Sequence, residues 1–230
     1  MVKQLLPGRI LRRIEIEYLK ETHINRSLRR FSGDTTYVEI GVRYGACIRQ
    51  INATRRIGID PAPVDPDNPS WNGVVLHRQT SDEYFRDHGP GELAAYSVNV
   101  ALADGFHEFR QTLRDVFNLE RFMSPNGVVY IHDCNPPTRA HAEDIHANDG
   151  NWNGDVWKVA YYLQHFRPDL KYFTLDCDWG LGVVSRFSAN PPAPEERHVE
   201  LVAALDYEVL ASDRKRILNL ESPLLFTAPW

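Results

Sequence analysis

The chain has 230 residues, of which 43% are apolar and 25% are charged, a balance typical of one globular unit with a sizeable core. Its 26 basic and 31 acidic residues give a formal net charge of −5, which disfavours a general nucleic-acid-binding surface. No apolar run approaches the roughly 20 residues of a membrane span, and charges interrupt residues 1–18 where a signal peptide needs an apolar stretch. We therefore expect a cytoplasmic protein that binds neither nucleic acid nor a membrane.

Short β-branched runs alternate with segments of helical periodicity along the chain, which is the pattern of an α/β fold. Several of the runs are almost wholly apolar, as strands buried on both faces of a sheet are. Only Asp176–Gly180 separates the last two runs, too few residues for a crossover helix, so we expect an antiparallel hairpin there. The prediction is a Rossmann-like, seven-stranded, mostly parallel sheet with this terminal hairpin and with helices on both faces. Its predicted strands are Thr36–Ile40, Arg56–Asp60, Gly73–Leu76, Val98–Ala103, Gly127–His132, Lys171–Leu175 and Leu181–Ser185.

Apolar side chains recur at helical spacing around these strands. Two such segments, Phe109–Phe117 and Val156–Leu163, are predicted to pack on the sheet as helices. An amphipathic helix is expected over Ile10–Tyr18, and one long closing helix from Glu195 to about Leu220. The apolar ending Pro223–Trp230 is expected to pack on its own domain or on a second subunit of a homo-oligomer. We predict one domain over 1–230, made of a helical extension (1–33), a core (34–188) and a C-terminal helix and tail (189–230).

A glycine-containing turn follows the first predicted strand, where Glu39-Ile-Gly41-Val-Arg43-Tyr-Gly45 leads into a short helical segment. Glycines at such a turn let the backbone approach a ligand closely, and the start of a helix offers free N–H groups. The second predicted strand ends at Asp60, where an acidic side chain can accept hydrogen bonds from ribose hydroxyls. Turn and acid together indicate a nucleotide-type binding site more strongly than a purely structural turn.

The turn resembles the motif of class I methyltransferases that use S-adenosylmethionine. Glu39, Gly41 and Gly45 fit that motif, and Arg43 stands where some members have a further glycine. The resemblance covers about residues 36–185, because the seven-stranded sheet with its terminal hairpin is also the architecture of that family. It implies that Glu39, Gly41 and Gly45 help to bind S-adenosylmethionine as cofactor.

The same resemblance implies roles for residues further along the chain. Asp60 would bind the ribose, and the loop Gln79–Phe85, with Thr80 and Ser81, would border the adenine. A dinucleotide-dependent oxidoreductase is the main alternative for a turn of this kind. The wide spacing of the two glycines and the terminal hairpin make that alternative the weaker one.

Acidic and imidazole side chains follow the fourth and fifth predicted strands, with Asp104 and His107 after one and His132 and Asp133 at the end of the other. Carboxyl ends of parallel strands meet at one edge of a sheet, so these side chains should converge. His107 is predicted to be a general base, because an imidazole with a pKa near about 6.5 suits proton removal at neutral pH. Asp104 is predicted to assist it or to contact the cofactor. Two carboxylates beside an imidazole also suit a divalent metal ion, held by Asp104, His132 and Asp133.

The combination of Asp104-Gly-Phe-His107 with His132-Asp133 resembles one branch of the family, the O-methyltransferases that modify sugars of macrolide-type natural products. Several members of that branch depend on magnesium and have an acid matching Asp104 and a base matching His107. The resemblance therefore implies methylation of a hydroxyl group. His132 stands where the branch has the first acid of a pair, which leaves open magnesium, a softer metal or no metal.

The long loop after the fifth predicted strand is expected to contact the substrate, as loops at this edge often do. Trp152 and Trp157 are predicted to stack on a sugar or aromatic ring, and Arg139 to pair with an acidic group, with a core position as the alternative for Trp157. The sequence thus predicts methyl transfer to a small-molecule acceptor, namely a natural product, a sugar or a phenol. A nucleoside-binding accessory protein of the same fold, without methyl transfer, is the alternative from another class.

Overall fold

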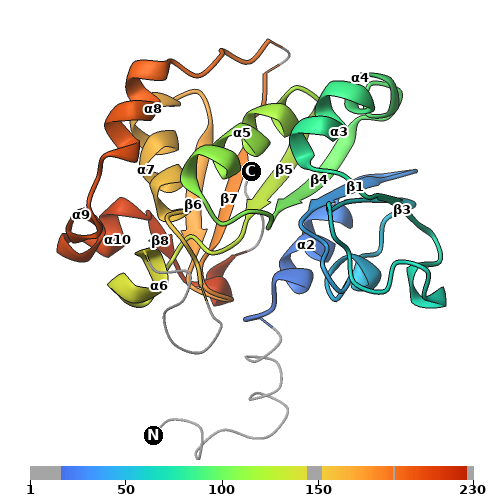
Figure 1. The fold of residues 1–230 in the computed structure, drawn as a ribbon, viewed down its shortest axis with the longest axis horizontal. Helices are drawn as coiled ribbons and strands as arrows, with labels where there is room; N and C mark the ends of the chain where they lie inside the picture. Colours follow the sequence, from blue (N-terminus) through green and yellow to red (C-terminus); the bar gives the residue numbers. More distant parts are fainter. Residues whose placement is uncertain (1–16, 144–151, 189, 227–230) are drawn as a thin grey trace, which may run out of the picture.

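The computed structural model describes residues 17–143, 152–188 and 190–226 (Figure 1). One sheet runs through them in the strand order β3-β2-β1-β4-β5-β7-β6-β8. Strands β1 to β5 pair in parallel, whereas β7 is antiparallel to both β5 and β6. The predicted mostly parallel sheet with an antiparallel terminal hairpin is confirmed. The strands are β1 (Thr36–Ile40), β2 (Arg55–Ile59), β3 (Val74–His77), β4 (Val98–Ala103), β5 (Met123–Ile131), β6 (Lys171–Leu175), β7 (Leu181–Ser185) and β8 (Leu220–Glu221).

The end of the described chain differs from the prediction in two respects. The sheet has eight strands rather than seven, because the short strand β8 pairs in parallel with β6 at the sheet edge. The predicted single helix from Glu195 to about Leu220 is wrong. Asp206 and Asp213 each accept a backbone N–H with the side chain and so begin a new helix. The segment therefore forms three short helices, α8 (Glu196–Ala203), α9 (Tyr207–Ser212) and α10 (Arg214–Ile217).

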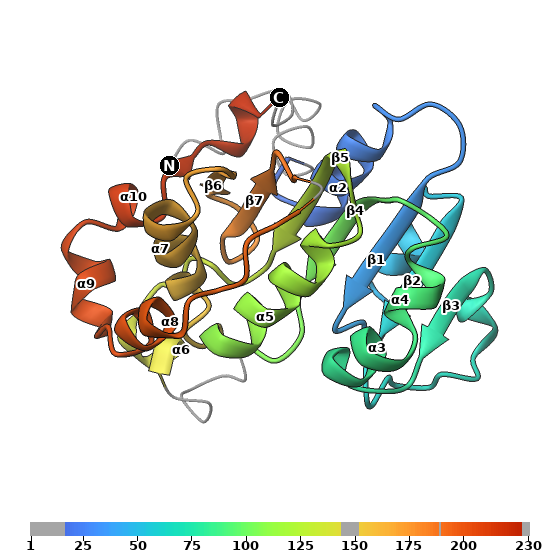
Figure 2. The same ribbon diagram turned by 90° about the horizontal axis from the view of Figure 1, so that it is seen from above.

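Helices lie on both faces of the sheet (Figures 1 and 2), with α5, α7 and α8 on one face and α2 on the other. The predicted helix over Ile10–Tyr18 falls almost entirely outside the described residues. Within the described part of the chain, no helix has the length and apolarity that crossing a membrane requires. The remaining helical elements are α2 (Lys20–Leu28), η1 (Ile48–Gln50), η2 (Pro69–Trp71), α3 (Ser81–Asp87), α4 (Gly89–Glu92), α5 (Phe109–Glu120), α6 (Arg139–Glu143), α7 (Trp157–Phe166) and η3 (Pro223–Leu225).

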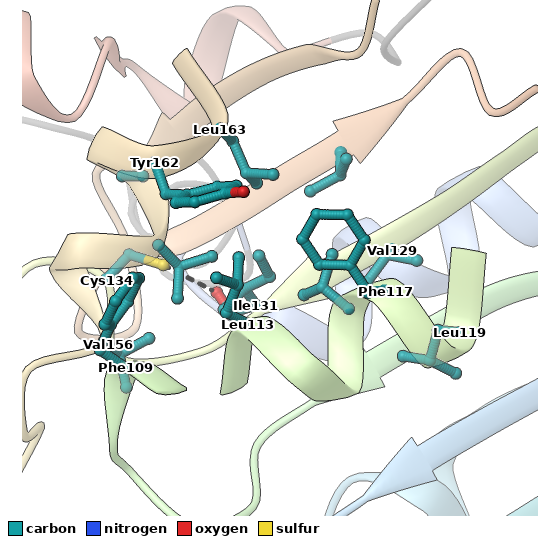
Figure 3. Packing of buried hydrophobic residues seen from close by; sticks show 14 of the residues in the cluster. Phe109, Leu113, Phe117, Leu119, Val129, Ile131, Cys134, Val156, Tyr162 and Leu163 are labelled. Atoms are coloured by element: carbon teal, nitrogen blue, oxygen red, sulfur yellow. Dashed lines mark hydrogen bonds between the residues drawn. The ribbon is translucent and has the colours of Figure 1, made fainter. Parts of the chain in front are cut away.

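The central strands are buried on both faces, and successive residues face the two layers alternately. In β5, Val129 and Ile131 belong to the core under α5 and α7, while Val128 and Tyr130 belong to the core under α2. Figure 3 shows side chains of α5 and α7, among them Phe117, filling the first of these cores. Because helices pack on both faces of the sheet, the loops at the carboxyl ends of its strands extend from a rigid base.

Candidate active site

A cavity of about 830 Å³ lies at the carboxyl ends of the central parallel strands. Its lining includes the first residues beyond four strands, Gly41 after β1, Asp60 after β2, Asp104 after β4 and His132 after β5. The strand order reverses between β1 and β4, and this switch point is where ligands bind in open α/β sheets. The volume is in the range of ligand sites in proteins, several hundred Å³, and suits a nucleoside together with a second reactant.

The half of the cavity around β1 and β2 carries the predicted nucleoside-binding residues. Gly41 has a φ of +85°, and a Cβ there would collide with the backbone carbonyl of Asp104, so this close approach of two turns requires glycine. The two carboxylate oxygens of Asp60 accept the backbone N–H groups of Arg43 (2.7 Å) and Ala62 (2.8 Å). Asp60 is thereby fixed at the end of β2, with lone pairs left for ribose hydroxyls.

Thr80 and Ser81 also line the cavity, whereas Gly45 does not. Thr80 caps α3 in a capping box with Glu83, and the hydroxyl of Ser81 donates to the carboxylate of Asp115 (2.6 Å). A Cβ on Gly45 would lie 2.7 Å from the ring of Trp71. Gly45 therefore packs closely on Trp71, and its predicted cofactor contact stays a prediction.

Glu39 lines the cavity but is only 2% exposed, and its carboxyl group accepts a hydrogen bond from the hydroxyl of Tyr37 (2.7 Å). Burial raises the pKa of Glu39 to about 8, Asp104 adds to the shift, and the Tyr37 hydrogen bond opposes it. A buried carboxyl group at this place suits a cationic ligand, which would favour its ionised form.

The raised pKa of Glu39 predicts a pH-dependent stability of the ligand-free protein. Between pH 4.5 and about 8 the folded state keeps a proton that the unfolded state has lost, so stability falls as pH rises through this window. Glu39→Gln removes this titration. We expect the unfolding free energy of the wild type, relative to that of Glu39→Gln, to fall as pH rises. Denaturant titration at about pH 5 and about pH 9 measures this difference. A difference that stays constant with pH would contradict the assignment.

The structure brings Asp104, His107, His132 and Asp133 together at the ends of β4 and β5. Nδ1 of His132 lies 2.8 Å from Oδ2 of Asp133 and 3.2 Å from Oδ1 of Asp104. Nε2 of His107 lies 3.4 Å from Oδ2 of Asp133 and 3.8 Å from Oδ1 of Asp104. Burial disfavours the imidazolium of His132, but the two carboxylates outweigh it and hold its pKa well above the ordinary value.

His107 is oriented by the segment that follows the long loop. Its Nδ1 lies 2.7 Å from the backbone carbonyl of Trp152, and its ring stacks on the Trp152 ring at a centroid distance of 5.7 Å. A carbonyl oxygen can only accept, so Nδ1 carries a proton and Nε2 of the neutral ring is free to take one. The arrangement gives His107 the tautomer that a general base at this cavity needs.

Gly154 holds this segment against His107. Its φ is +62°, and a Cβ there would collide with the backbone carbonyl of His107. We expect Gly154→Ala to lower kcat by roughly 10- to 100-fold, because small displacements of a base are costly to catalysis. Gly91→Ala is the matched control, since nothing lies within 4 Å of a Cβ there. Equal rates for the two variants in a steady-state assay would contradict the role of Gly154.

The structure adds Lys20, Asn153 and Asp178 to the cluster, which sequence reasoning missed. Nζ of Lys20 lies 3.0 Å from Oδ2 of Asp104 and 3.9 Å from Oδ2 of Asp178, and Nδ2 of Asn153 donates to Oδ1 of Asp133 (2.5 Å). Asp178 also faces Nε2 of His132 at 3.5 Å. The one available signal was the hairpin Asp176–Gly180, which places an acid beside a tryptophan at the active edge.

A metal ion fits this cluster poorly. Ligand atoms of Asp104, His107 and Asp133 lie within 4.8 Å of one another, as a metal site would need. However, each of the four carboxylate oxygens of Asp104 and Asp133 already faces an N–H donor of Lys20, His132 or Asn153 within 3.2 Å. The predicted metal ligand His132 faces carboxylates with both ring nitrogens, as an ion-pair partner does.

Two predicted substrate contacts lie away from the cavity. Trp157 is 1% exposed and belongs to the hydrophobic core, which was the alternative interpretation. Arg139 pairs on the surface with Glu143, Asp206 and Glu208 at 2.6–2.9 Å. Neither lines the cavity, whereas Trp152 does. The predicted roles of Trp157 and Arg139 are therefore corrected.

Comparisons with known proteins agree with this fold. Residues 38–134 match the family model of a methyltransferase domain. None of the curated proteins matches the chain. A solved structure of a Klebsiella pneumoniae protein, provisionally described as an O-methyltransferase, matches with a TM-score of 0.51 at 13% identity, over 81% of this chain and 94% of that chain. Residues 38–134 are thus similar to a methyltransferase domain, and the described chain shares its fold with the solved structure.

Proposed function

We propose that this protein transfers a methyl group from S-adenosylmethionine to a hydroxyl group of a ring-shaped small molecule. The proposal rests on the orientation of His107, whose Nδ1 is held by the Trp152 carbonyl and which lines the same cavity as Asp60, the predicted nucleoside-binding residue. A base and a nucleoside site in one cavity suit methyl transfer to an oxygen that must lose its proton.

The residues around β1 and β2 would hold the cofactor. Asp60 would bind the ribose, Thr80 and Ser81 would border the adenine, and Glu39 would face the cationic part. When bound, S-adenosylmethionine would supply an electrophilic methyl group, and the bond between that methyl carbon and the sulfur would break, which leaves S-adenosylhomocysteine. The protein contributes by holding the acceptor oxygen in line with that group, which removes much of the entropic cost of the reaction.

His107 would act on the acceptor. As the acceptor oxygen forms its bond to the methyl carbon, its proton passes to Nε2 of His107, while Nδ1 keeps the proton that it donates to the Trp152 carbonyl. Asp133 at 3.4 Å and Asp104 at 3.8 Å would stabilise the imidazolium that forms. The proton then leaves to water, which restores the base.

Aromatic side chains support a ring-shaped acceptor. Phe106 (58% exposed), Trp152 and Trp179 (40% exposed) line the cavity, and we name them the aromatic wall. The ring of His141 stacks on Trp179, and its backbone carbonyl accepts the N–H groups of Asn153 and Gly154 beside Trp152. Exposed aromatic rings in a cavity are typical of sites that bind sugar or aromatic rings.

Transfer of an isotope-labelled methyl group tests the proposal. The protein is incubated with labelled S-adenosylmethionine and a panel of phenols, sugars and polyhydroxylated rings, together with a small-molecule extract. We expect the label on an oxygen of a ring-shaped molecule, located by mass spectrometry. Label found only on nitrogen, on protein or on nucleic acid would contradict the proposal, as would bound cofactor without any transfer.

A further inference from the structure

We propose that Lys20 and His132 take the place of a divalent metal ion at this site. Their side chains pair with the carboxylates that would otherwise bind the ion, and Lys20 holds the acceptor oxygen while that oxygen loses its proton. Methyl transfer at this site then needs no metal. The inference rests on the proposed function and deepens it, because it assigns the positive charge of the reaction to a residue outside the segment 38–134.

Lys20 is fixed at the cavity by the packing of α2. The hydroxyl of Tyr130 on β5 donates to the backbone carbonyl of His23 (3.0 Å) and lies 2.8 Å from the hydroxyl of Ser27. The side chain of Lys20 is 15% exposed, and its ammonium group reaches Asp104 at 3.0 Å. Lys20 is therefore a component of the cavity wall and not a mobile surface lysine.

His132 binds three carboxylates through its two ring nitrogens. Nδ1 lies between oxygens of Asp104 and Asp133, and because ionised carboxylate oxygens only accept, this contact requires a proton on Nδ1. Nε2 faces Asp178 at 3.5 Å. A metal ion needs a lone pair from an imidazole, and the nitrogen that faces Asp104 and Asp133 carries a proton, so His132 offers no ligand atom to an ion between these two carboxylates.

Every oxygen of the Asp104 and Asp133 carboxylates faces an N–H donor. Oδ1 of Asp104 faces His132 and Oδ2 faces Lys20, while Oδ1 of Asp133 faces Asn153 and Oδ2 faces His132. A divalent ion bound by these oxygens would lie next to the Lys20 ammonium group, which repels it, and would share each oxygen with an existing N–H donor.

Lys20 can also act on the reaction. An ammonium group has three N–H donors; two face Asp104 and Asp178, which leaves one for an oxygen in the cavity that Lys20 lines. The acceptor oxygen gains negative charge as its proton moves to His107. A fixed positive charge beside that oxygen stabilises the charge as it develops, which is the task that a metal would perform elsewhere.

Manganese binding tests the first half of the proposal without any need for methyl transfer. Metal-free wild type, Lys20→Met and His132→Asp are titrated with Mn²⁺, and free Mn²⁺ is followed by electron paramagnetic resonance. We expect no stoichiometric site in the wild type and at least a tenfold higher affinity in His132→Asp, lost again when Asp104→Asn is added. A stoichiometric wild-type site that Asp104→Asn removes would overturn the proposal. Lys20→Met serves the same purpose if His132→Asp does not fold.

Kinetics test the second half. We expect wild-type activity to stay within about twofold in excess chelator, and Lys20→Met to lower kcat by roughly 10²–10³-fold at unchanged cofactor affinity. Lys215→Met, exposed on α10, is the matched control and should leave kcat unchanged. Full activity of Lys20→Met, or wild-type activity lost to the chelator and restored by Mg²⁺, would overturn the proposal. If neither the wild type nor any variant binds S-adenosylmethionine, the proposed function is refuted instead. The Mn²⁺ titration would still test the first half of the proposal.

Discussion

His107→Ala should lower kcat by roughly 10²–10⁴-fold while the affinity for S-adenosylmethionine changes little. The lost interaction belongs to proton transfer from the acceptor, which occurs only on the way to the transition state. In the proposed binding mode the cofactor would be held mainly from the other half of the cavity, where Asp60 is fixed by the N–H groups of Arg43 and Ala62. Initial rates at saturating cofactor, together with calorimetry, separate the two effects.

His165→Ala is the matched control for this prediction. His165 lies on α7, is exposed, and bonds through Nδ1 to its own helix at the carbonyl of Tyr161. Its removal should leave kcat unchanged. Full activity of His107→Ala would show that the contact between His107 and Trp152 only holds the loop in place. Catalysis would then depend on the proximity of the reactants alone.

Glu120→Ala should destabilise the fold by about 3 kcal/mol, because it leaves a buried guanidinium without its main partner. Glu120 is 1% exposed, and its two oxygens accept from Nη1 and Nη2 of Arg167 at 2.7 and 2.6 Å. Arg167, itself 3% exposed, follows α7, so this bidentate pair ties the ends of α5 and α7 together over the core. Because Asp169 also binds Arg167, we expect the loss of unfolding free energy to lie at the lower end of the range that is usual for breaking a buried ion pair.

Denaturant titration measures that loss, with Glu200→Ala as the control. Glu200 also pairs with an arginine, Arg110 at 2.7 Å, but its side chain is 59% exposed. Exposed ion pairs contribute little to stability because water screens them. Equal stability changes in the two variants would show that the buried pair does not hold the two helices together.

The strand ends were predictable from sequence, and with them half of the site. Asp104 and Asp133 follow apolar runs that can only be buried parallel strands, and the carboxyl ends of such strands meet at one edge. Lys20 was not predictable, because its position depends on how α2 docks through Tyr130, a contact between residues far apart in the chain. No local pattern encodes such a contact.

Other differences have local causes that the sequence leaves ambiguous. The position of Trp157 in the helical pattern of apolar residues is compatible with a place in the core or at the cavity. Only the packing of α7 on the sheet determines that Trp157 lies in the core. Strand β8 comprises only Leu220–Glu221, too short to show a period of two. The glycine at 45 has the spacing of a cofactor motif, yet its neighbour is the ring of Trp71, which lies 26 positions later in the chain.

Calorimetric titration with S-adenosylmethionine, S-adenosylhomocysteine and NADH tests which nucleoside ligand the cavity binds. We predict that the wild type binds both adenosyl compounds and not NADH. Asp60→Ala should bind S-adenosylmethionine roughly 10- to 100-fold more weakly, as expected for lost hydrogen bonds to a carboxylate, whereas Asp67→Ala, an exposed acid outside the cavity lining, should bind normally. Binding of NADH with no binding of either adenosyl compound would contradict the account.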